Sequence, residues 1–302
     1  MERQVSEKQA YIMYIASLLV VGTIGVVRRA IPLSSGLLAF VRGLLGALSL
    51  LLFVKLRRRR IGSRTDRRKR LLLILTGVAL SFNWMLLFEA YTYTTVASAT
   101  LCYYFQPTII LLFSPLLFRE KLTGRKLLCA ALAILGMVFV SGVTEQCNLP
   151  TGHLKGIVYG LGAACLYAAV VILNKKLSGI DAYEKTIVEL LAAAAAMLPY
   201  LLLTGELRAV RLDMPLLALL LLIGVVYTGL VYALYFGSMD ALKAQTIAIL
   251  SYLDPVVALL VSALVLHEKL SARGLLGAVL ILGAALFCEW QPGRGAVQAR
   301  RR

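Results

Sequence analysis

The chain contains one 30-residue stretch twice. Residues 104–133 and 252–281 align without a gap at an offset of 148, with 14 of the 30 positions identical. Chance explains many leucine matches, so the similarity depends mainly on Pro107 and Pro255 and on the E-K-L-x-x-R turn that follows each proline at the same distance. Each copy is an apolar run broken near its start by proline, then a charged turn and a second apolar run. A duplicated helical hairpin of this kind implies a duplicated protein.

The apolar runs are long enough to cross a membrane. Sixty per cent of the 302 residues are apolar, whereas a soluble domain is nearer half, and a membrane-spanning helix needs about 20 apolar residues. Ten such runs can be placed, at 10–27, 34–54, 71–91, 95–118, 124–143, 154–174, 186–204, 214–236, 244–266 and 273–290. A barrel strand needs only about 10 residues and alternates polar with apolar. In hydrocarbon a helix satisfies its own backbone hydrogen bonds, so we predict an all-α integral membrane protein with ten transmembrane helices.

These ten runs divide into two sets of five. The segment 144–153 holds asparagine, proline and glycine in turn positions and marks the boundary between halves. We therefore expect a first five-helix repeat at 1–147, a second at 148–292 and a basic tail at 293–302. Because five is odd, the second copy enters the bilayer the opposite way up. Inverted repeats of this kind are common in secondary transporters, with the substrate site near the midplane between them.

The net charge of +17 is concentrated on one side of the predicted membrane. Counting loops, 24 basic residues lie on the side of the two termini and seven on the other. The positive-inside rule then predicts that both termini are cytoplasmic, in a cell membrane. The polybasic loop 55–70 holds ten of these residues. We interpret it as a topology anchor, with contact to anionic lipids as the alternative, and we expect no nucleic-acid partner.

One carboxylate lies deep within an apolar run. Asp254 is about ten residues into its run, or roughly 15 Å at the helical rise, near the midplane of a core about 30 Å thick. An unpaired acid there is costly, so it should face a wet cavity, hold a cation or be protonated. Pro255 follows at once and frees a backbone carbonyl, as in the broken helices that line transport sites. A hydrogen-bonded structural acid is the alternative.

The first copy carries matching residues at the same level. Gln106 is the repeat mate of the acid and directly precedes Pro107. It can bind substrate or hold two helices together. Tyr104 and Tyr252 lie two residues before the two positions. They either stack against a substrate or make a helix contact.

A second polar group is expected nearer the outer surface. Arg42 lies about eight residues below it, and either binds a carboxylate or phosphate of the substrate or pairs with Glu89. Glu89 is otherwise a hydrated interfacial acid. Asn83 and Trp84 are deeper, in a run that we expect to line the cavity. Glu189 is close to the inner face, where its side chain can snorkel to water.

Catalysis has little support in the sequence. The two histidines, His153 and His267, lie in outer turns far apart in the chain. No metal-ligand spacing, phosphate-binding loop or nucleophile motif is present, so no cofactor, metal or enzymatic activity is predicted. A membrane enzyme would need clustered acids or histidines at one interface. A non-transporting scaffold would need a dry, tightly packed midplane.

The chain resembles the EamA-type permeases of the drug/metabolite transporter superfamily. The resemblance rests on Arg42 in SSGLLAFVRGLLGAL, on Pro107 with REKLTGRKLLCAALAILG, and on the second copy DPVVALLVSALVLHEKLSARGLLGAVLILGAAL, and it covers about residues 10 to 290. It implies ten helices in two five-helix repeats, cytoplasmic termini and movement of a small organic solute, often outward. The polybasic loop is longer than usual, and Asp254 replaces a residue that is often uncharged.

The functional prediction is a secondary transporter that works by alternating access. Asp254, Gln106 and the two repeat tyrosines form its central site, and Arg42 with Glu89 forms an outer polar cluster. An acid and a base within one bundle suit a zwitterion, so an amino acid is the first guess for the solute, with export as the direction. Proton coupling through Asp254 is left open.

Overall fold

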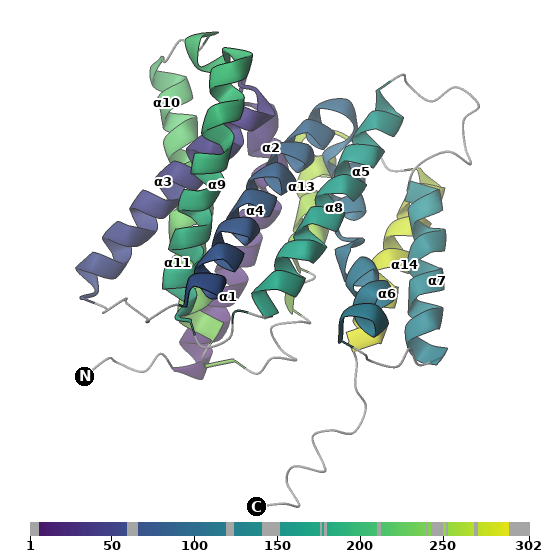
Figure 1. Ribbon diagram of the computed structural model, residues 1–302. Helices are drawn as coiled ribbons and strands as arrows, with labels where there is room; N and C mark the ends of the chain where they lie inside the picture. Colours follow the sequence, from purple (N-terminus) through teal and green to yellow (C-terminus); the bar gives the residue numbers. More distant parts are fainter. Residues whose placement is uncertain are drawn as a thin grey trace, which may run out of the picture.

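The computed structural model is an α-helical bundle (Figure 1). It describes residues 6–58, 66–118, 124–140, 152–175, 177, 180–209, 213–239, 241–242, 250–251, 253–268 and 271–289. Within these ranges all regular structure is helical. The prediction of an all-α fold is therefore confirmed for the part of the chain that is described. Most of the polybasic loop, the REKL corner and the basic tail lie outside it.

The first half supplies seven helical segments. They are α1 (Glu7–Gly22), α2 (Ile24–Arg29), α3 (Ser35–Leu56), α4 (Arg67–Tyr93), α5 (Val96–Tyr103), α6 (Gln106–Phe118) and α7 (Gly124–Val140). Side-chain caps define several starts, because the first backbone N–H groups of a helix have no internal acceptor. Ser34 caps α3 by accepting from the N–H of Leu37 at 3.3 Å. Thr95 caps α5 by accepting from the N–H of Ser98 at 3.0 Å.

The second half repeats this order with one irregular rod. Its segments are α8 (His153–Lys175), α9 (Ala182–Thr204), η1 (Glu206–Ala209), α10 (Met214–Leu221), η2 (Leu222–Leu230), α11 (Val231–Met239), α13 (Leu253–Val265) and α14 (Ala272–Glu289). The segment η2 is a π-helix between α10 and α11. Gly205 takes a left-handed conformation with φ of 71° and ends α9, as glycine commonly does after a helix.

Among the described residues, six helical rods are long and apolar enough to cross a membrane. They span 7–29, 35–56, 67–93, 153–174, 182–204 and 214–238. Three further predicted runs appear as shorter apolar helices, and the run at 95–118 is divided between α5 and α6. Large apolar side chains face outward, with Leu203 89% exposed and Leu264 73% exposed. An apolar exterior of this kind suits a lipid environment.

Several contacts between helices recur when each helix is replaced by its equivalent in the other half of the chain. At the repeat offset, α1–α2 corresponds to α8, α3 to α9, α4 to the α10–α11 rod, α6 to α13, and α7 to α14. The counterpart of α5 falls mostly outside the described residues. In the bundle α3 packs on α9 and α7 packs on α14. The contact of α4 with α8 has its counterpart in that of α11 with α1, and the contact of α4 with α9 in that of η2 with α3. These helix contacts of one half thus have counterparts in the other half.

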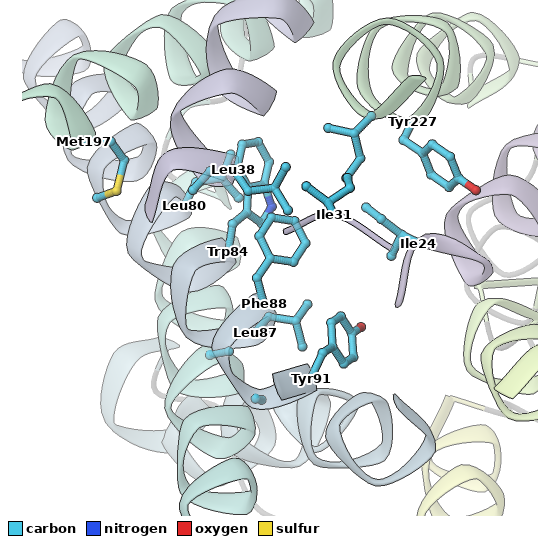
Figure 2. Packing of buried hydrophobic residues seen from close by; sticks show 14 of the residues in the cluster. Ile24, Ile31, Leu38, Leu80, Trp84, Leu87, Phe88, Tyr91, Met197 and Tyr227 are labelled. Atoms are coloured by element: carbon cyan, nitrogen blue, oxygen red, sulfur yellow. The ribbon is translucent and has the colours of Figure 1, made fainter. Parts of the chain in front are cut away.

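The largest buried cluster surrounds α4. Figure 2 shows Trp84 and Phe88 of this helix lying beside Leu38 of α3, with Ile24 and Tyr227 across the cluster. Between helices in lipid, side chains of this kind contribute through van der Waals packing. Helix α4 packs against α8, α9 and α3, so its side chains that face these helices have defined positions.

Polar contacts place the second corner at one end of the bundle. Arg29, the last residue of α2, forms an ion pair with Glu268 at 2.8 Å and donates to the carbonyl of Thr94 at 2.8 Å. The N–H of Val96, at the start of α5, donates to Glu268 at 2.9 Å. The α13–α14 corner therefore lies where α5 begins. Figure 1 shows α6 approaching α7 at the opposite end.

The contact between α7 and α14 provides a test of this packing. A Cβ atom at Gly277 would lie 2.5 Å from the carbonyl oxygen of Gly136, whereas one at Gly283 would meet nothing within 4 Å. Gly277→Leu should separate the two helices and lower the free energy of unfolding by about 1–3 kcal/mol. Gly283→Leu, on the same helix, is the matched control and should unfold like wild type. Equal thermal midpoints for the two variants in detergent would contradict this packing.

Candidate functional site

The fourth predicted run is broken at its middle. Helix α5 ends at Tyr103, two turn residues follow, and α6 begins at Gln106. Pro107 therefore lies in the first turn of α6, where the missing N–H removes no helical hydrogen bond. The break leaves Tyr104 at the end of one helix and Gln106 at the start of the next.

The second copy places its acid directly before its proline. The described part of helix α13 runs from Leu253, with Asp254 and Pro255 next, and Leu250 and Ser251 before it are also helical. Asp254 aligns with Gln106 at the repeat offset, and each residue directly precedes a proline. Tyr252 lies outside the described residues.

Asp254 is held by the other half of the chain. The hydroxyl of Tyr104 donates to its Oδ2, and Arg42 interacts with it electrostatically. Helix α1 crosses closely here, because a Cβ atom at Gly22 would lie 2.9 Å from the carbonyl oxygen of Asp254. Both Asp254 and Tyr104 keep partial solvent exposure. The acid is therefore bonded across the two halves and keeps part of its surface exposed.

Arg42 is the opposite charge near this acid. Its side chain on α3 is only 6% exposed, and its guanidinium carbon lies 4.1 Å from the ring centroid of Trp84 and 5.8 Å from that of Phe88. Its Nε donates to the hydroxyl of Thr228 at 3.1 Å. Stacking on aromatic faces stabilises a cation by about 0.5–2 kcal/mol. The two rings and the hydroxyl hold the guanidinium in one orientation.

The π-helix η2 positions the partner of this arginine. Thr228 donates to the carbonyl of Ile223, five residues earlier, at 3.0 Å. Helix α3 approaches η2 closely, since a Cβ atom at Gly46 would lie 2.4 Å from the methyl of Thr228 and one at Gly224 would lie 2.3 Å from the Cβ of Leu45. π-Helical turns within α-helices are frequently found at functional sites. The run of apolar residues at 214–236 gives no sequence signal for this irregularity.

Glu89 belongs to a separate network at the outer end. The hydroxyl of Ser35 donates to its Oε2 at 2.6 Å, and Arg28 donates to the same hydroxyl at 3.2 Å. Within the described residues the predicted ion pair between Arg42 and Glu89 does not form. The physical reason is that the aromatic rings on α4 take up the guanidinium, while Glu89 lies one turn farther along, beside α2 and the start of α3.

Two predicted amides differ in their surroundings. Asn83 is 0% exposed and donates to the carbonyl of Ala163 on α8 at 2.6 Å. It therefore serves as a contact between α4 and α8, where the prediction was a cavity-lining side chain. Gln106 is partly exposed as a residue, but its Oε1 has no accessible surface and no donor in the part of the chain that is described. This acceptor is therefore buried and unsatisfied there.

Four tyrosines lie beside the two charged groups. The ring centroid of Tyr103 lies 5.9 Å from that of Tyr104 and 5.5 Å from that of Tyr167. Tyr167 interacts electrostatically with Asp254, and the hydroxyl of Tyr232 lies beside the Arg42 guanidinium. All these tyrosines are partly exposed. Tyr103 was missed from the sequence, although its place directly before the helix break was an available signal.

We call the following residues the central constellation: Arg42, Tyr103, Tyr104, Tyr167, Tyr232 and Asp254. It combines one cation, one anion and neutral hydroxyl groups from both halves of the chain. Among the described residues, no group of three or more histidine, cysteine, aspartate or glutamate side chains could hold a metal ion. The arrangement is chemically suited to binding a polar solute.

Both halves of the chain match the model of the EamA-like transporter family, over residues 8–142 and 154–289. The chain belongs to the EamA-like transporter family. This membership and the six long apolar helices make it a multi-pass membrane protein. The resemblance drawn from the REKL and HEKL turns is thereby confirmed.

Several relatives of this chain are named as transporters. An uncharacterized transporter, YxxF of Bacillus subtilis (strain 168), is 27% identical over 98% of this chain and 95% of its own length. An uncharacterized transporter of Archaeoglobus fulgidus is 30% identical, over 90% and 93%. A probable amino-acid metabolite efflux pump of Escherichia coli (strain K12) is 28% identical, over 70% and 74%.

A solved crystal structure shares the fold of this EamA chain. It matches with a TM-score of 0.63 at 18% sequence identity, covering 94% of this chain and 98% of that chain. The similarity extends over the whole helical bundle. At this identity it supports the fold alone.

The Arg42 contact can be tested through its acceptor. Thr228→Val keeps the shape of the side chain but leaves the buried Nε without its partner, which should cost about 1–3 kcal/mol of unfolding free energy. Thr204→Val is the matched control, because the exposed Thr204 hydroxyl bonds only to its own helix at Tyr200. Thermal unfolding in detergent measures both. An unchanged midpoint in Thr228→Val would show that this contact does not stabilise the bundle.

Proposed function

We propose that this EamA protein is a secondary transporter in which two inverted five-helix repeats enclose a central solute site. The observation that carries the proposal is the convergence of Arg42 and Asp254 on one set of tyrosines. The base comes from the first half of the chain and the acid from the second, and each is bonded to a residue of the other half. A site shared between repeats can be exposed to either side when the repeats rock against each other.

A zwitterion fits this distribution of charge. The guanidinium of Arg42 suits a carboxylate, and Asp254 suits an ammonium group. The hydroxyls of Tyr104 and Tyr232 lie beside these two groups and offer further hydrogen bonds. An amino acid or related metabolite is therefore the proposed solute class, with export as the direction. The name of the Escherichia coli relative, a probable amino-acid metabolite efflux pump, supports the same class.

Ten spans with inverted repeats are part of the proposal. Exchange of the halves reproduces the helix contacts, which supports repeats at 1–147 and 148–292. Glu268 of the HEKL turn lies at the end of the bundle where α5 begins. This position supports the proposal that the REKL and HEKL turns lie on opposite sides of the membrane. The excess of basic residues supports cytoplasmic termini in the cell membrane. The polybasic loop 55–70 would then face the anionic lipids of the inner leaflet.

The bonds within the site suggest how solute binding drives movement. Tyr104 with Asp254 and Arg42 with Thr228 are both contacts between the halves. A zwitterion that binds the acid and the base competes with these contacts, so its binding changes the relative stability of the two orientations. A non-transporting scaffold would need a dry midplane, whereas Asp254 and its tyrosine neighbours keep accessible surface.

Transport assays test the assignment of the site. A thermal-shift screen of the purified protein against amino acids, purines, polyamines and sugars identifies the solute, and counterflow in liposomes measures its exchange. Asp254→Asn and Arg42→Gln should each lower exchange by at least about 30-fold, since removing one member of a buried charged contact costs about 2 kcal/mol or more.

Asp181→Asn is the matched control for these variants. Asp181 caps α9 by accepting from the N–H groups of Tyr183 and Glu184, and asparagine caps a helix about equally well. Its exchange should equal that of wild type. Wild-type exchange in both site variants would place the solute elsewhere.

Proton coupling through Asp254 has a separate test. If this acid carries the coupled proton, a pH gradient should drive accumulation by wild type, and Asp254→Asn should lose that dependence because the amide does not titrate. Residual counterflow by Asp254→Asn, measured without a gradient, is the control for an intact protein. Uptake by the variant with unchanged pH dependence would remove Asp254 from coupling.

A further inference from the structure

One ion pair joins the two halves of the chain at the predicted outer end of the bundle. Arg29 of α2 pairs with Glu268, which follows α13, at 2.8 Å. The side chain of Glu268 is only 9% exposed, whereas that of Arg29 is 37% exposed. A carboxylate that is withdrawn from water needs an opposite charge and hydrogen bonds to compensate it. The groups around Glu268 therefore decide whether the two halves stay together at this end.

The first half supplies two donors to this carboxylate. Besides Arg29, the N–H of Val96, the first residue of α5, donates to the Oε2 of Glu268 at 2.9 Å. Arg29 also donates to the carbonyl of Thr94 at 2.8 Å. A Cβ atom at Gly25 of α2 would lie 2.4 Å from the Cγ1 of Val96. Helix α2 and the start of α5 thus form one packed surface against which the carboxylate lies.

The second half directs Glu268 toward that surface. His267 takes a left-handed conformation with φ of 54°, and the N–H of Glu268 returns to the carbonyl of Ser262 at 3.3 Å. The hydroxyl of Ser262 also donates to the Oε2 of Glu268. A left-handed conformation is uncommon for a residue with a side chain and costs energy. The contacts that Glu268 makes compensate this cost.

Helix α13 connects the ion pair to the central constellation. Asp254 in α13 accepts from Tyr104, where α5 has just ended, and Glu268 beyond α13 accepts from Val96, where α5 begins. Helices α5 and α13 therefore run antiparallel and are bonded to each other at both ends. Movement of α13 away from the first half must break both contacts.

We propose that Arg29 and Glu268 form an outer gate, which holds the predicted outer side of the central constellation closed in this structure. The inference rests on the proposed function, because a gate has a role only if the two halves move. Opening requires that the carboxylate leave the guanidinium of Arg29 and the N–H of Val96 and become hydrated. A solute that displaces Tyr104 from Asp254 removes one of the two bonds between α5 and α13, so its binding favours opening of the gate.

Distances between spin labels test the outer gate without any solute. Ala30 follows Arg29, Ala272 lies four residues after Glu268, and both alanines are exposed. Each is replaced by cysteine in a cysteine-free chain and labelled with a nitroxide, and double electron–electron resonance in nanodiscs gives the distances between the labels. With the gate intact, short distances should dominate. Glu268→Gln should raise the ratio of long to short distances about fivefold, the effect of losing a partly exposed ion pair.

Two further variants separate the ion pair from other effects. Arg29→Gln should raise the same ratio. The variant with both changes should show less than the product of the two single effects, because the second change finds no partner left to remove. Asp213→Asn is the matched control. The exposed Asp213 caps α10 by accepting from the N–H of Leu216 at 2.9 Å, and asparagine keeps such a cap, so its distances should equal those of the unchanged chain.

The outcomes distinguish the outer gate from the transport proposal. Unchanged distances in Glu268→Gln and Arg29→Gln, or single effects that simply multiply, overturn the gate. If Glu268→Gln does not fold, longer distances in Arg29→Gln support the gate and unchanged ones overturn it. Longer distances in a protein that shows no counterflow with any solute support a contact that opens, and they contradict the proposed function instead.

Discussion

The bilayer core offers no water, so a polar group within a span must find its partner inside the bundle. In this EamA protein those partners come repeatedly from the opposite half of the chain. Arg42 bonds to Thr228, Tyr104 bonds to Asp254, and Arg29 pairs with Glu268. Each contact joins the repeats at a different place. The lack of water in the bilayer core therefore favours polar contacts between the two halves, and the charged groups lie where the halves meet.

Close backbone packing makes these contacts specific. Glycines at the crossing of α3 with η2 and at the crossing of α7 with α14 let helices approach until side chains meet backbone atoms. Without a hydrophobic effect between helices, such packing is a main source of association in lipid. Rigid rods joined by a few polar contacts can rock as units. The broken run at Tyr104 and the π-helix around Thr228 place irregular backbone beside the charged groups, as expected at a transport site.

The sequence alone predicted much of the architecture, because lipid imposes length, apolarity and repetition on a chain. It also brought Tyr104 and Asp254 to one level through the repeat offset. The sequence did not predict side-chain partners that depend on the direction in which a side chain leaves its helix. Arg42 meets aromatic rings instead of Glu89, and Glu189 is buried instead of snorkelling. The π-helix is set by packing against α3, which no local pattern in an apolar run records.

The inverted arrangement of the repeats is most directly tested by a labelling measurement at two repeat mates. Gly124 and Ala272 are the first residues of α7 and α14, at the repeat offset, and both are exposed. Each is replaced by cysteine in a cysteine-free chain and treated with a membrane-impermeant maleimide in right-side-out and inside-out vesicles. With inverted repeats, Gly124→Cys should react only from the cytoplasmic side and Ala272→Cys only from the outer side. Reaction of both from the same side would contradict it.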